Sequence, residues 1–533
     1  MEHSQLLPKI QTKDPQPNTL DNPDAFLGDA NEFKRPALNL VNDLCNALRE
    51  EEINYCHWKS NNALDRSANG DNDLDLLVSR GDATRFSEIL FRLGFMQAKA
   101  PPDKQMPGVL DYFGYDEQAD KWVHVHAHYQ LIMGHDTTKN FRLPIESPYL
   151  ESSGWDGIFR VPSVEFEFVV FIVRMVLKYS TWDALLSLDA KLKASERKEL
   201  TYLQDRIKQD RLSEMLKHHL PAIDNDLFKK CVQALQPGCS IWTRMKIGQE
   251  LQTNLQANAY HSMPVDTFLK LWHRTALRIR RRVFKTPSKY SLEIGGAMIA
   301  IVGGDGAGKS TAIETLNTWL SKNFLTTRVH MGRPAWSWLT ILVRSILKLG
   351  QIMGLYPLEA PFDETIEQKS PVSPGYPYLI REVCRARDRY WIYVRARRFA
   401  TRGGLVILDR FPLPQIRIMD GAQAEQFVRG LNEGPRADQF LTPRPDNWFT
   451  KFLIKLEESY YHKVSIPELL FVLRVDPAIA VQRKTDEDSA LVEKRSREIW
   501  QLNWEKTGAY VIDASRSKKE VASELKTLIW SRL

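Results

Sequence analysis

The chain has 533 residues, of which 43% are hydrophobic and 26% are charged, and its formal net charge is +7. This length is too great for one hydrophobic core, and the composition is that of an ordinary globular protein with two to four domains. The modest positive charge favours anionic ligands but is too small for a dedicated nucleic-acid-binding protein, so no specific nucleic-acid partner is expected.

The cysteines and the apolar stretches favour a cytoplasmic protein. Five cysteines are scattered without a CxxC pair, which indicates neither a disulfide framework nor a metal site. Residues 1–36 lack the features of a signal peptide and are rich in Pro, Asn and Asp, so we expect a flexible tail. The longest apolar stretches, residues 166–177 and 336–356, both contain charged residues, and no transmembrane segment is expected.

Residues 37–160 are expected to form an α/β domain. An amphipathic pattern predicts a helix over 38–50, and "LDLLV" predicts a strand over 74–78. A helix over 83–93 and a strand over 121–132 continue the alternation.

Residues 161–290 indicate a mostly helical extension that ends in a basic connector, "RTALRIRRRVFK". The connector is either a solvated helix or a contact for acidic lipid or another polyanion. The second alternative leaves peripheral membrane contact open.

Two carboxylates lie at the start of the predicted strand over 74–78, in "HWKSNNALDRSANGDNDLDLLV". Asp73 and Asp75 are two residues apart, so they share one face of the strand and could meet a divalent ion together. This pattern resembles the nucleotidyltransferase superfamily, in which a small-residue loop holds a triphosphate and Asp-x-Asp holds metal ions. The resemblance implies a third acidic residue on a neighbouring strand, where this chain has "WVHVHAHYQL".

His126 is the residue that we expect at this acidic position, with His124 and His128 on the same face of the strand. Asp73, Asp75 and His126 therefore form a candidate second metal site. Because imidazole prefers softer ions than Mg²⁺, the two alternatives are a transition-metal site and a degenerate domain whose histidines are ordinary polar strand residues.

Residues 291–533 alternate between apolar runs of strand length and helical patterns. Strands are expected over 298–302, 328–331, 405–409, 469–475 and 509–512, and helices near 309–322, 336–353, 376–402, 477–504 and 517–532. Continuous apolar strands that alternate with helices are typical of a parallel sheet covered on both faces. We therefore expect an α/β fold in both halves of the chain.

The strand over 298–302 leads directly into a phosphate-binding P-loop, "GGDGAGKST". Backbone N–H groups and the start of the next helix surround an anion in such a loop, while the lysine reaches the terminal phosphates. Ser310 is the expected hydroxyl ligand of Mg²⁺. The expected nucleotide-binding residues are Gly303, Gly304, Asp305, Gly306, Ala307, Gly308, Lys309, Ser310 and Thr311.

Two further motifs follow the P-loop. Asp409 and Arg410 end the strand in "VILDRF", where the carboxylate could bind Mg²⁺ and the guanidinium an acceptor phosphate; a helix cap and a surface arginine are the alternative. A basic segment then follows "VDPAIAVQRK", which is either a flap that closes on the transferred phosphoryl group or a solvated charged helix. Its basic residues are Arg483, Lys484, Lys494, Arg495 and Arg497.

These motifs together resemble the thymidylate kinase family over residues 296–533, and the closing "GAYVIDASRSKKEV" fits the same pattern. The resemblance implies ATP and Mg²⁺ as cofactors and a small-molecule monophosphate as acceptor. Asp305 would contact the acceptor sugar, Arg389 its base and Arg410 its phosphate. Lys309, Asp409, Arg410 and Arg483 would be catalytic.

The segments that shape the acceptor pocket depart from the family, at "MGRPAW" and "FPLPQIRIMDGA" and in a long apolar insertion between them. The acceptor identity is therefore open. A nucleoside monophosphate is the leading hypothesis. A phosphorylated sugar, a lipid-linked saccharide, and a non-catalytic ATP-binding sensor or scaffold are the alternatives, and a homodimer is left open.

Overall fold

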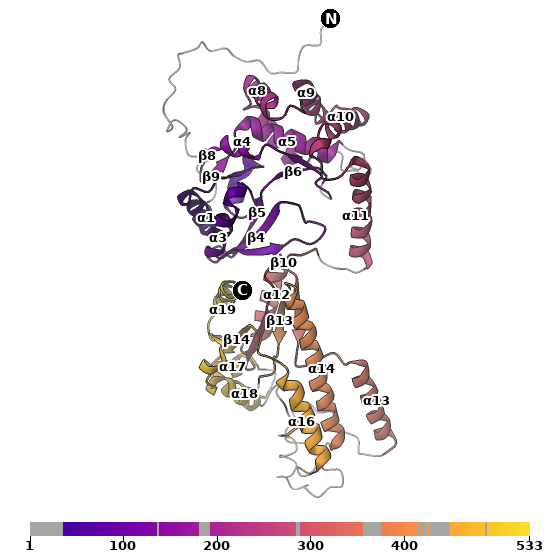
Figure 1. Ribbon diagram of the computed structural model, residues 1–533. Helices are drawn as coiled ribbons and strands as arrows, with labels where there is room; N and C mark the ends of the chain where they lie inside the picture. The colour runs from indigo at the N-terminus through magenta and orange to yellow at the C-terminus, as the bar shows by residue number, and fades with distance from the viewer. Residues whose placement is uncertain are drawn as a thin grey trace.

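The computed structural model describes residues 36–533, except 136–137, 181–191, 284–287, 355–374, 414–415, 417–421, 423, 426–446 and 486–487. The predicted tail lies outside the described residues up to residue 35, as do parts of the long apolar insertion and of "FPLPQIRIMDGA". Two α/β halves lie end to end, the N-terminal half above and the P-loop half below in Figure 1. No helix in the described ranges is long and apolar enough to cross a membrane.

The N-terminal half contains a six-stranded mixed sheet in the order β1-β2-β5-β4-β3-β10, in which β2 and β5 are parallel. Its strands are β1 (Tyr55–His57), β2 (Leu74–Val78), β3 (Met96–Lys99), β4 (Val109–Asp116), β5 (Lys121–His128) and β10 (Ser291–Leu292). Two hairpins accompany the sheet, β6 (Leu131–Met133) with β7 (Phe141–Leu143) and β8 (Gly154–Asp156) with β9 (Phe159–Val161). The predicted strand over 121–132 is therefore β5 followed by β6.

Side-chain alternation separates the two faces of this sheet. Leu74 and Leu76 of β2 pack with Val125 of β5 in a core that also contains residues of α1 (Asn39–Glu50) and α3 (Ala83–Arg92). Asp75 lies between the two leucines in the sequence, and the β5 histidines alternate with apolar residues such as Val125. Asp75 and these histidines lie on the opposite face of the sheet, because successive strand residues point to opposite sides. The polar face predicted from the sequence is thus present.

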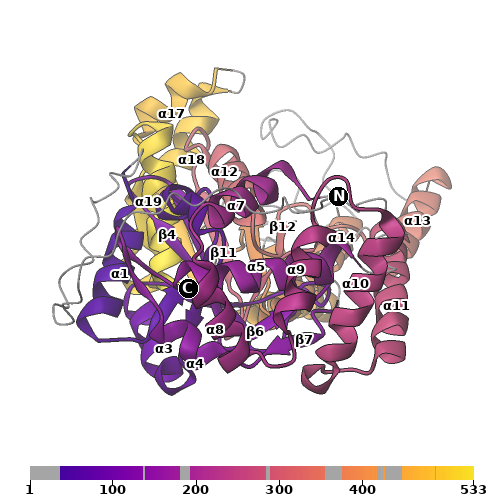
Figure 2. The same cartoon turned by 90° about the horizontal axis from the view of Figure 1, so that it is seen from above.

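A helical layer follows, as expected for residues 161–290. Helix α4 (Glu146–Glu151) lies before this range, and the helices within it are α5 (Val164–Tyr179), α7 (Ala194–Gln204), α8 (Gln209–His219), α9 (Asn225–Ala234), α10 (Ile241–Asn254) and α11 (Met263–Val283). The central helix is α5, which is buried nearly all round by α7 to α10 together with α4 and the β6–β7 hairpin. Burial inside the protein therefore explains the continuous apolar sequence of α5, and contact with a membrane is not needed to explain it. Figure 1 shows α5 beneath α8, α9 and α10, and Figure 2 shows the same layer from above.

The C-terminal half contains a five-stranded parallel sheet in the order β12-β13-β11-β14-β15. The strands are β11 (Met298–Gly303), β12 (Thr326–His330), β13 (Leu405–Asp409), β14 (Leu469–Arg474) and β15 (Tyr510–Asp513). The helices are α12 (Lys309–Ser321), α13 (Trp338–Ile352), α14 (Tyr376–Thr401), α16 (Trp448–His462), α17 (Pro477–Arg483), α18 (Ser489–Gln501) and α19 (Lys518–Arg532). Residues of α12 and α19 pack on one face, and residues of α14 and α18 pack on the other.

All five predicted strands of this half are present, with small shifts at their ends. The single helix predicted over 477–504 is wrong, because α17 ends at Arg483 and α18 begins after Asp488, whose side chain caps it by accepting from the backbone N–H of Ala490 at 3.0 Å. Helix α16 was not predicted.

The two halves share a hydrophobic core instead of meeting only through a linker. The ring of Trp122 on β5 stacks on Trp319 of α12 with centroids 4.7 Å apart and an interplanar angle of 18°. Trp530 of α19 donates from Nε1 to the carbonyl of Gly94 at 3.0 Å. The edge strand β10 also joins the N-terminal sheet by pairing with β3, although it directly precedes β11 in the sequence.

A candidate phosphoryl-transfer site and a histidine–carboxylate cluster

The P-loop lies between the end of β11 and the start of α12. Gly308 adopts the left-handed conformation with φ of 80° and is the N-cap of α12. Lys309 folds back over the loop, and its Nζ lies 2.9 Å from the carbonyl of Gly303 and 2.7 Å from that of Gly304. Backbone N–H groups at such a helix start attract an anion. The predicted nucleotide-binding residues therefore run from the end of β11 through the loop into the first turn of α12, and their contact with a nucleotide stays a prediction.

Helices α17 and α18 pack directly on this loop. A Cβ atom on Gly304 would lie 2.8 Å from the Cα of Ser496 in α18, and one on Gly306 would lie 2.7 Å from the carbonyl oxygen of Ala480 in α17. Both distances are too short for a side chain, so close approach requires glycine at both positions, and the φ of 73° at Gly306 favours glycine there as well. The basic segment thus lies against the P-loop.

Within this segment, Arg495 is the arginine that reaches the P-loop. Its Nη1 lies 3.0 Å from Oδ2 of Asp305, which is buried. Burial alone would raise the pKa of Asp305, but Lys309 and Arg495 lower it below its usual value. Arg483 instead donates to the carbonyls of Ala514 and Ser515 at 2.7 and 3.1 Å, so its catalytic role stays a prediction.

The other three predicted basic residues lie in the same segment. Lys484 is close enough to lower the pKa of Asp305, after the larger effects described above. Arg497 pairs with Glu493 one turn earlier, and Lys494 belongs to the same helix α18. A solvated charged face therefore accounts for Arg497 but not for Arg495.

Asp409 and Arg410 lie at the carboxyl end of β13, which is hydrogen-bonded to β11. Asp409 is buried, and its Oδ2 lies 3.3 Å from Nη2 of Arg328. Its carboxylate and the Ser310 hydroxyl are oxygen donors at the same edge of the sheet, and such donors fit Mg²⁺. Where Mg²⁺ binds, Asp409 and Ser310 are the described residues that would hold it.

Arg410 has an unusual backbone. Its φ of 54° lies in the left-handed region, which costs free energy for a residue with a Cβ atom. Its half-buried guanidinium makes no hydrogen bond or ion pair with any residue that the structure describes. Strain of this kind is often found at functional sites.

Arg389, the predicted base contact, is buried in α14 and holds neighbouring backbone. Its Nε donates to the carbonyl of Met331 at 2.9 Å and its Nη2 to that of Gly332 at 3.2 Å, both at the start of "MGRPAW". Nη1 also donates to the hydroxyl of Tyr461 on α16. These contacts give Arg389 a positioning role, and contact with an acceptor base stays a prediction.

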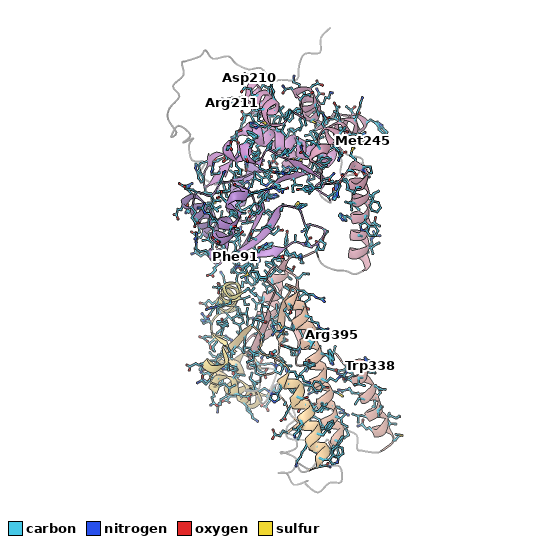
Figure 3. All side chains as sticks on the ribbon, in the orientation of Figure 1. Phe91, Asp210, Arg211, Met245, Trp338 and Arg395 are labelled. Atoms are coloured by element: carbon cyan, nitrogen blue, oxygen red, sulfur yellow. The ribbon has the colours of Figure 1, made fainter. Side chains whose placement is uncertain are left out.

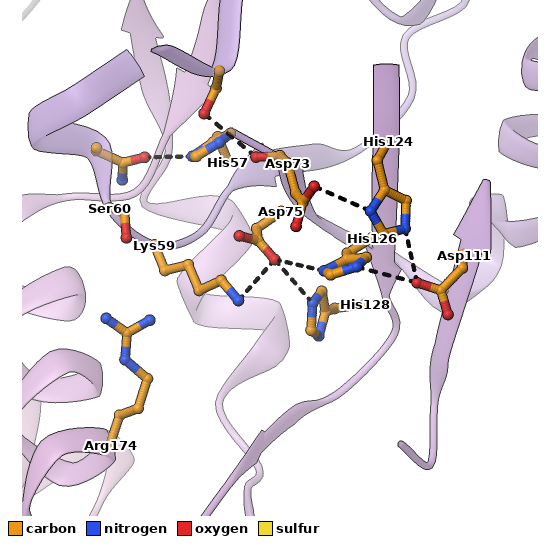
Figure 4. A network of polar contacts seen from close by, with 12 residues as sticks. His57, Lys59, Ser60, Asp73, Asp75, Asp111, His124, His126, His128 and Arg174 are labelled. Atoms are coloured by element: carbon orange, nitrogen blue, oxygen red, sulfur yellow. Dashed lines mark hydrogen bonds and ion pairs between the residues drawn. The ribbon is translucent and has the colours of Figure 1, made fainter. Parts of the chain in front are cut away.

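A second polar site lies on the polar face of the N-terminal sheet (Figure 4). Asp75 Oδ1 lies 2.7 Å from Lys59 Nζ and 3.2 Å from His126 Nδ1, and strand pairing places Asp75 opposite His126. Asp73 instead pairs with His124 at 3.1 Å. The three predicted metal residues thus fall into two groups that share His126: Asp73, His124 and His126, and Asp75, His126 and His128.

The cluster contains a carboxylate that sequence reasoning missed. Asp111 on β4 places Oδ1 3.1 Å from His126 Nε2 and 3.0 Å from His124 Nε2. No strand is predicted from the sequence over "VLDYFGYD", which is β4, so Asp111 is not expected beside the histidines.

The carboxylates control the charge of the histidines. Burial alone would lower the pKa of His126, but hydrogen bonds with Asp111 and Asp75 raise it to about 9. These two carboxylates therefore favour the imidazolium form of His126 at neutral pH. Burial lowers the pKa of His128 to about 4, so His128 is neutral.

The loop after β1 connects this cluster to the helical layer. Ser60 has φ of 61°, and its backbone N–H donates to Glu199 on α7 at 3.2 Å. The N–H of Asn61 donates to Glu167 on α5 at 3.3 Å. Arg174 of α5 pairs with Glu199 at 3.2 Å. Residues of α5 and α7 thus hold the loop that carries Lys59 in place.

Comparisons with known proteins give distant relatives. No protein-family model matches the chain. Two curated proteins named "uncharacterized ATP-binding protein YghR", from Escherichia coli K12 and from Escherichia coli O6:H1 CFT073, are each 27% identical over 233 residues, or 43% of this chain and 84% of the relative. A thymidylate kinase structure from Candida albicans matches with 15% identity over 44% of this chain and 91% of its own, at a TM-score of 0.26. The sheet order and the P-loop geometry therefore define the fold of the C-terminal half.

Proposed function

We propose that the protein is an ATP- and Mg²⁺-dependent kinase that transfers the γ-phosphoryl group to a nucleoside monophosphate. The observation that carries this proposal is the strained Arg410, which has no described partner, at the strand end beside the P-loop. A protein that only binds ATP has no need of a guanidinium group at this strand end. The name of the Escherichia coli relatives supports ATP as the nucleotide.

The residues divide the work between donor and acceptor. Lys309 and the P-loop N–H groups hold the β- and γ-phosphates, and Arg410 holds the acceptor phosphate as a bidentate donor. Mg²⁺, when bound, would neutralise charge on the donor phosphates. Arg495 lies 3.0 Å from Asp305 and is available to stabilise the transferred group if that ion pair opens. Positioning and charge stabilisation then supply most of the acceleration.

The test is product formation from ATP, Mg²⁺ and a panel of nucleoside and sugar monophosphates that includes thymidylate. We expect ADP release to depend on one nucleoside monophosphate, with a matching diphosphate product seen by chromatography. ATP binding without acceptor-dependent turnover on the whole panel would instead support a sensor or scaffold.

One observation favours an amphiphilic acceptor as a second candidate. The apolar face of α13 is exposed, with Trp338 at 75% and Ile352 at 73%, and Figure 3 shows Trp338 on this outer helix. The helix begins beside the predicted acceptor pocket, because the N–H of Ser337 donates to Asp388, the neighbour of Arg389, at 3.2 Å. A lipid-linked saccharide phosphate, supplied in detergent micelles, therefore belongs in the same panel. Turnover only with this acceptor would replace the nucleoside monophosphate.

A further inference from the structure

The metal chemistry implied by a nucleotidyltransferase-like domain does not fit the N-terminal cluster. That chemistry places Mg²⁺ between carboxylates, and Mg²⁺ demands oxygen ligands in octahedral geometry. Here Asp73 and Asp75 belong to different groups of potential ligands, and each group contains two histidines. Imidazole nitrogens suit zinc, copper, iron and nickel better than magnesium. The donor set therefore points to another class of ion.

We propose that Asp75, His126 and His128 bind one divalent transition-metal ion of the zinc class. The distances from Asp75 Oδ1 are 3.2 Å to His126 Nδ1 and 3.5 Å to His128 Nε2. Ligands at about 2.1 Å in a tetrahedron are separated by roughly 3.4 Å, which both distances from Asp75 Oδ1 match. The ligand atoms of all three residues lie within 4.8 Å of one another, so a small closure around an ion would complete the site. The two strands fix this spacing, because Asp75 pairs opposite His126, and His128 lies two residues further along β5.

A second observation comes from the partners of the two histidines. His128 is buried, and its Nε2 faces Asp75 Oδ1 at 3.5 Å, which is longer than an ordinary N–H···O hydrogen bond, with no other hydrogen-bond partner among the described residues. His126 would bind the proposed ion through Nδ1, which loses its proton when the ion binds, while its Nε2 lies 3.1 Å from Asp111. Metal-binding histidines usually donate their second N–H to a carboxylate, which orients the ring. Asp111 is thus the positioning carboxylate of the site.

Three protein ligands leave one tetrahedral position for another group. Lys59 Nζ lies 2.7 Å from Asp75 Oδ1, so this ammonium occupies the side of the carboxylate that faces the Lys59–Ser60 loop. Three-ligand sites with an open position bind water or substrate, whereas structural zinc sites have four protein ligands. The proposed site is therefore of the open type.

Metal titration of the full-length protein tests this assignment. Chelator-treated protein is titrated with Co²⁺, a spectroscopic substitute for Zn²⁺, while visible absorption reports coordination geometry. We expect one equivalent with the intense bands of tetrahedral Co²⁺, displaced by Zn²⁺ but not by a large excess of Mg²⁺. Weak octahedral absorption, no saturable binding, or displacement by Mg²⁺ would overturn the proposal.

Variants then identify the ligands. Asp75→Asn, His126→Gln and His128→Gln should each weaken Co²⁺ binding by at least about a hundredfold, and Asp111→Asn by about 10- to 100-fold as a positioning carboxylate. Asp73→Asn and His124→Gln are the matched controls from the other group and should change the affinity little. Loss of binding in these controls with retention in His128→Gln would move the ion to the other group. Asp75→Asn is nearly isosteric and decides the assignment if a histidine variant fails to fold.

Discussion

At the scale of single residues, Lys309 and Arg410 serve different substrates in the proposed site. Lys309→Ala should lower turnover by about a hundredfold or more, because it removes charge stabilisation that grows toward the transition state. Arg410→Ala should cost about 2–5 kcal/mol spread over acceptor affinity and turnover, while the KM for ATP hardly changes. Steady-state kinetics with both substrates varied separate the two, and Arg402→Ala, at an exposed position, is the control.

An Arg410→Ala enzyme that bound ATP and acceptor equally poorly would contradict the acceptor role. So would unchanged kinetics. In either case Arg410 would be a strained surface residue without a substrate contact.

Glu167 gives a residue-scale prediction about pH. Burial raises its pKa from 4.5 to about 7, Glu199 adds to this, and Asn61 and Arg174 oppose it. The native state therefore binds a proton more tightly than the unfolded state, and the stability from this proton is lost as pH rises from about 4.5 to about 7.

Glu167→Gln removes this titration. Relative to the parent, its free energy of unfolding should rise by roughly 2–3 kcal/mol between about pH 5 and pH 8. Urea unfolding at the two pH values measures the difference, with the exposed Glu293→Gln as control. If the difference in free energy of unfolding between the variant and the parent did not change with pH, the pKa of Glu167 would not be raised in the native state.

At the scale of elements, the contact between the P-loop and the basic segment can be broken by one methyl group. Gly304→Ala would place a Cβ 2.8 Å from the Cα of Ser496, so α18 must move away. We expect a loss of about 1–3 kcal/mol of stability and a clear loss of ATP affinity by calorimetry. Gly154→Ala, with nothing within 4 Å, should change neither. Normal ATP affinity in Gly304→Ala would mean that nucleotide binding does not need this contact.

Regular patterns made much of this fold predictable from the sequence. The strand before the P-loop and the one ending at Asp409 are continuous apolar runs, which only a sheet covered on both faces explains. The shared face of Asp75 and His126 follows from strand alternation. Asp111 could not be predicted, because its place beside His126 depends on strand order, which no local pattern contains. The partners of Arg495 and Arg483 depend likewise on tertiary packing.

At the scale of the whole molecule, aromatic packing joins the two halves. Trp122→Ala removes a ring that contacts both Trp319 and Trp530, and should cost about 3–5 kcal/mol. Because the lost contacts cross between the halves, we expect calorimetry to show two unfolding transitions in the variant. Trp242→Ala, whose ring is 72% exposed, is the control. One cooperative transition at a lower temperature would instead mean that other contacts are sufficient to couple the halves.

The short strand β10 limits how the chain can be divided. Ser291 and Leu292 pair with β3 of the N-terminal sheet, and the N–H of Leu292 also donates to the carbonyl of Gly403 in the P-loop half at 2.9 Å. An N-terminal fragment that stops before Ser291 leaves the outer edge of β3 unpaired, and unpaired strand edges promote aggregation. A fragment that continues through β10 removes those residues from the P-loop half. Limited proteolysis therefore should not release two intact domains at this junction.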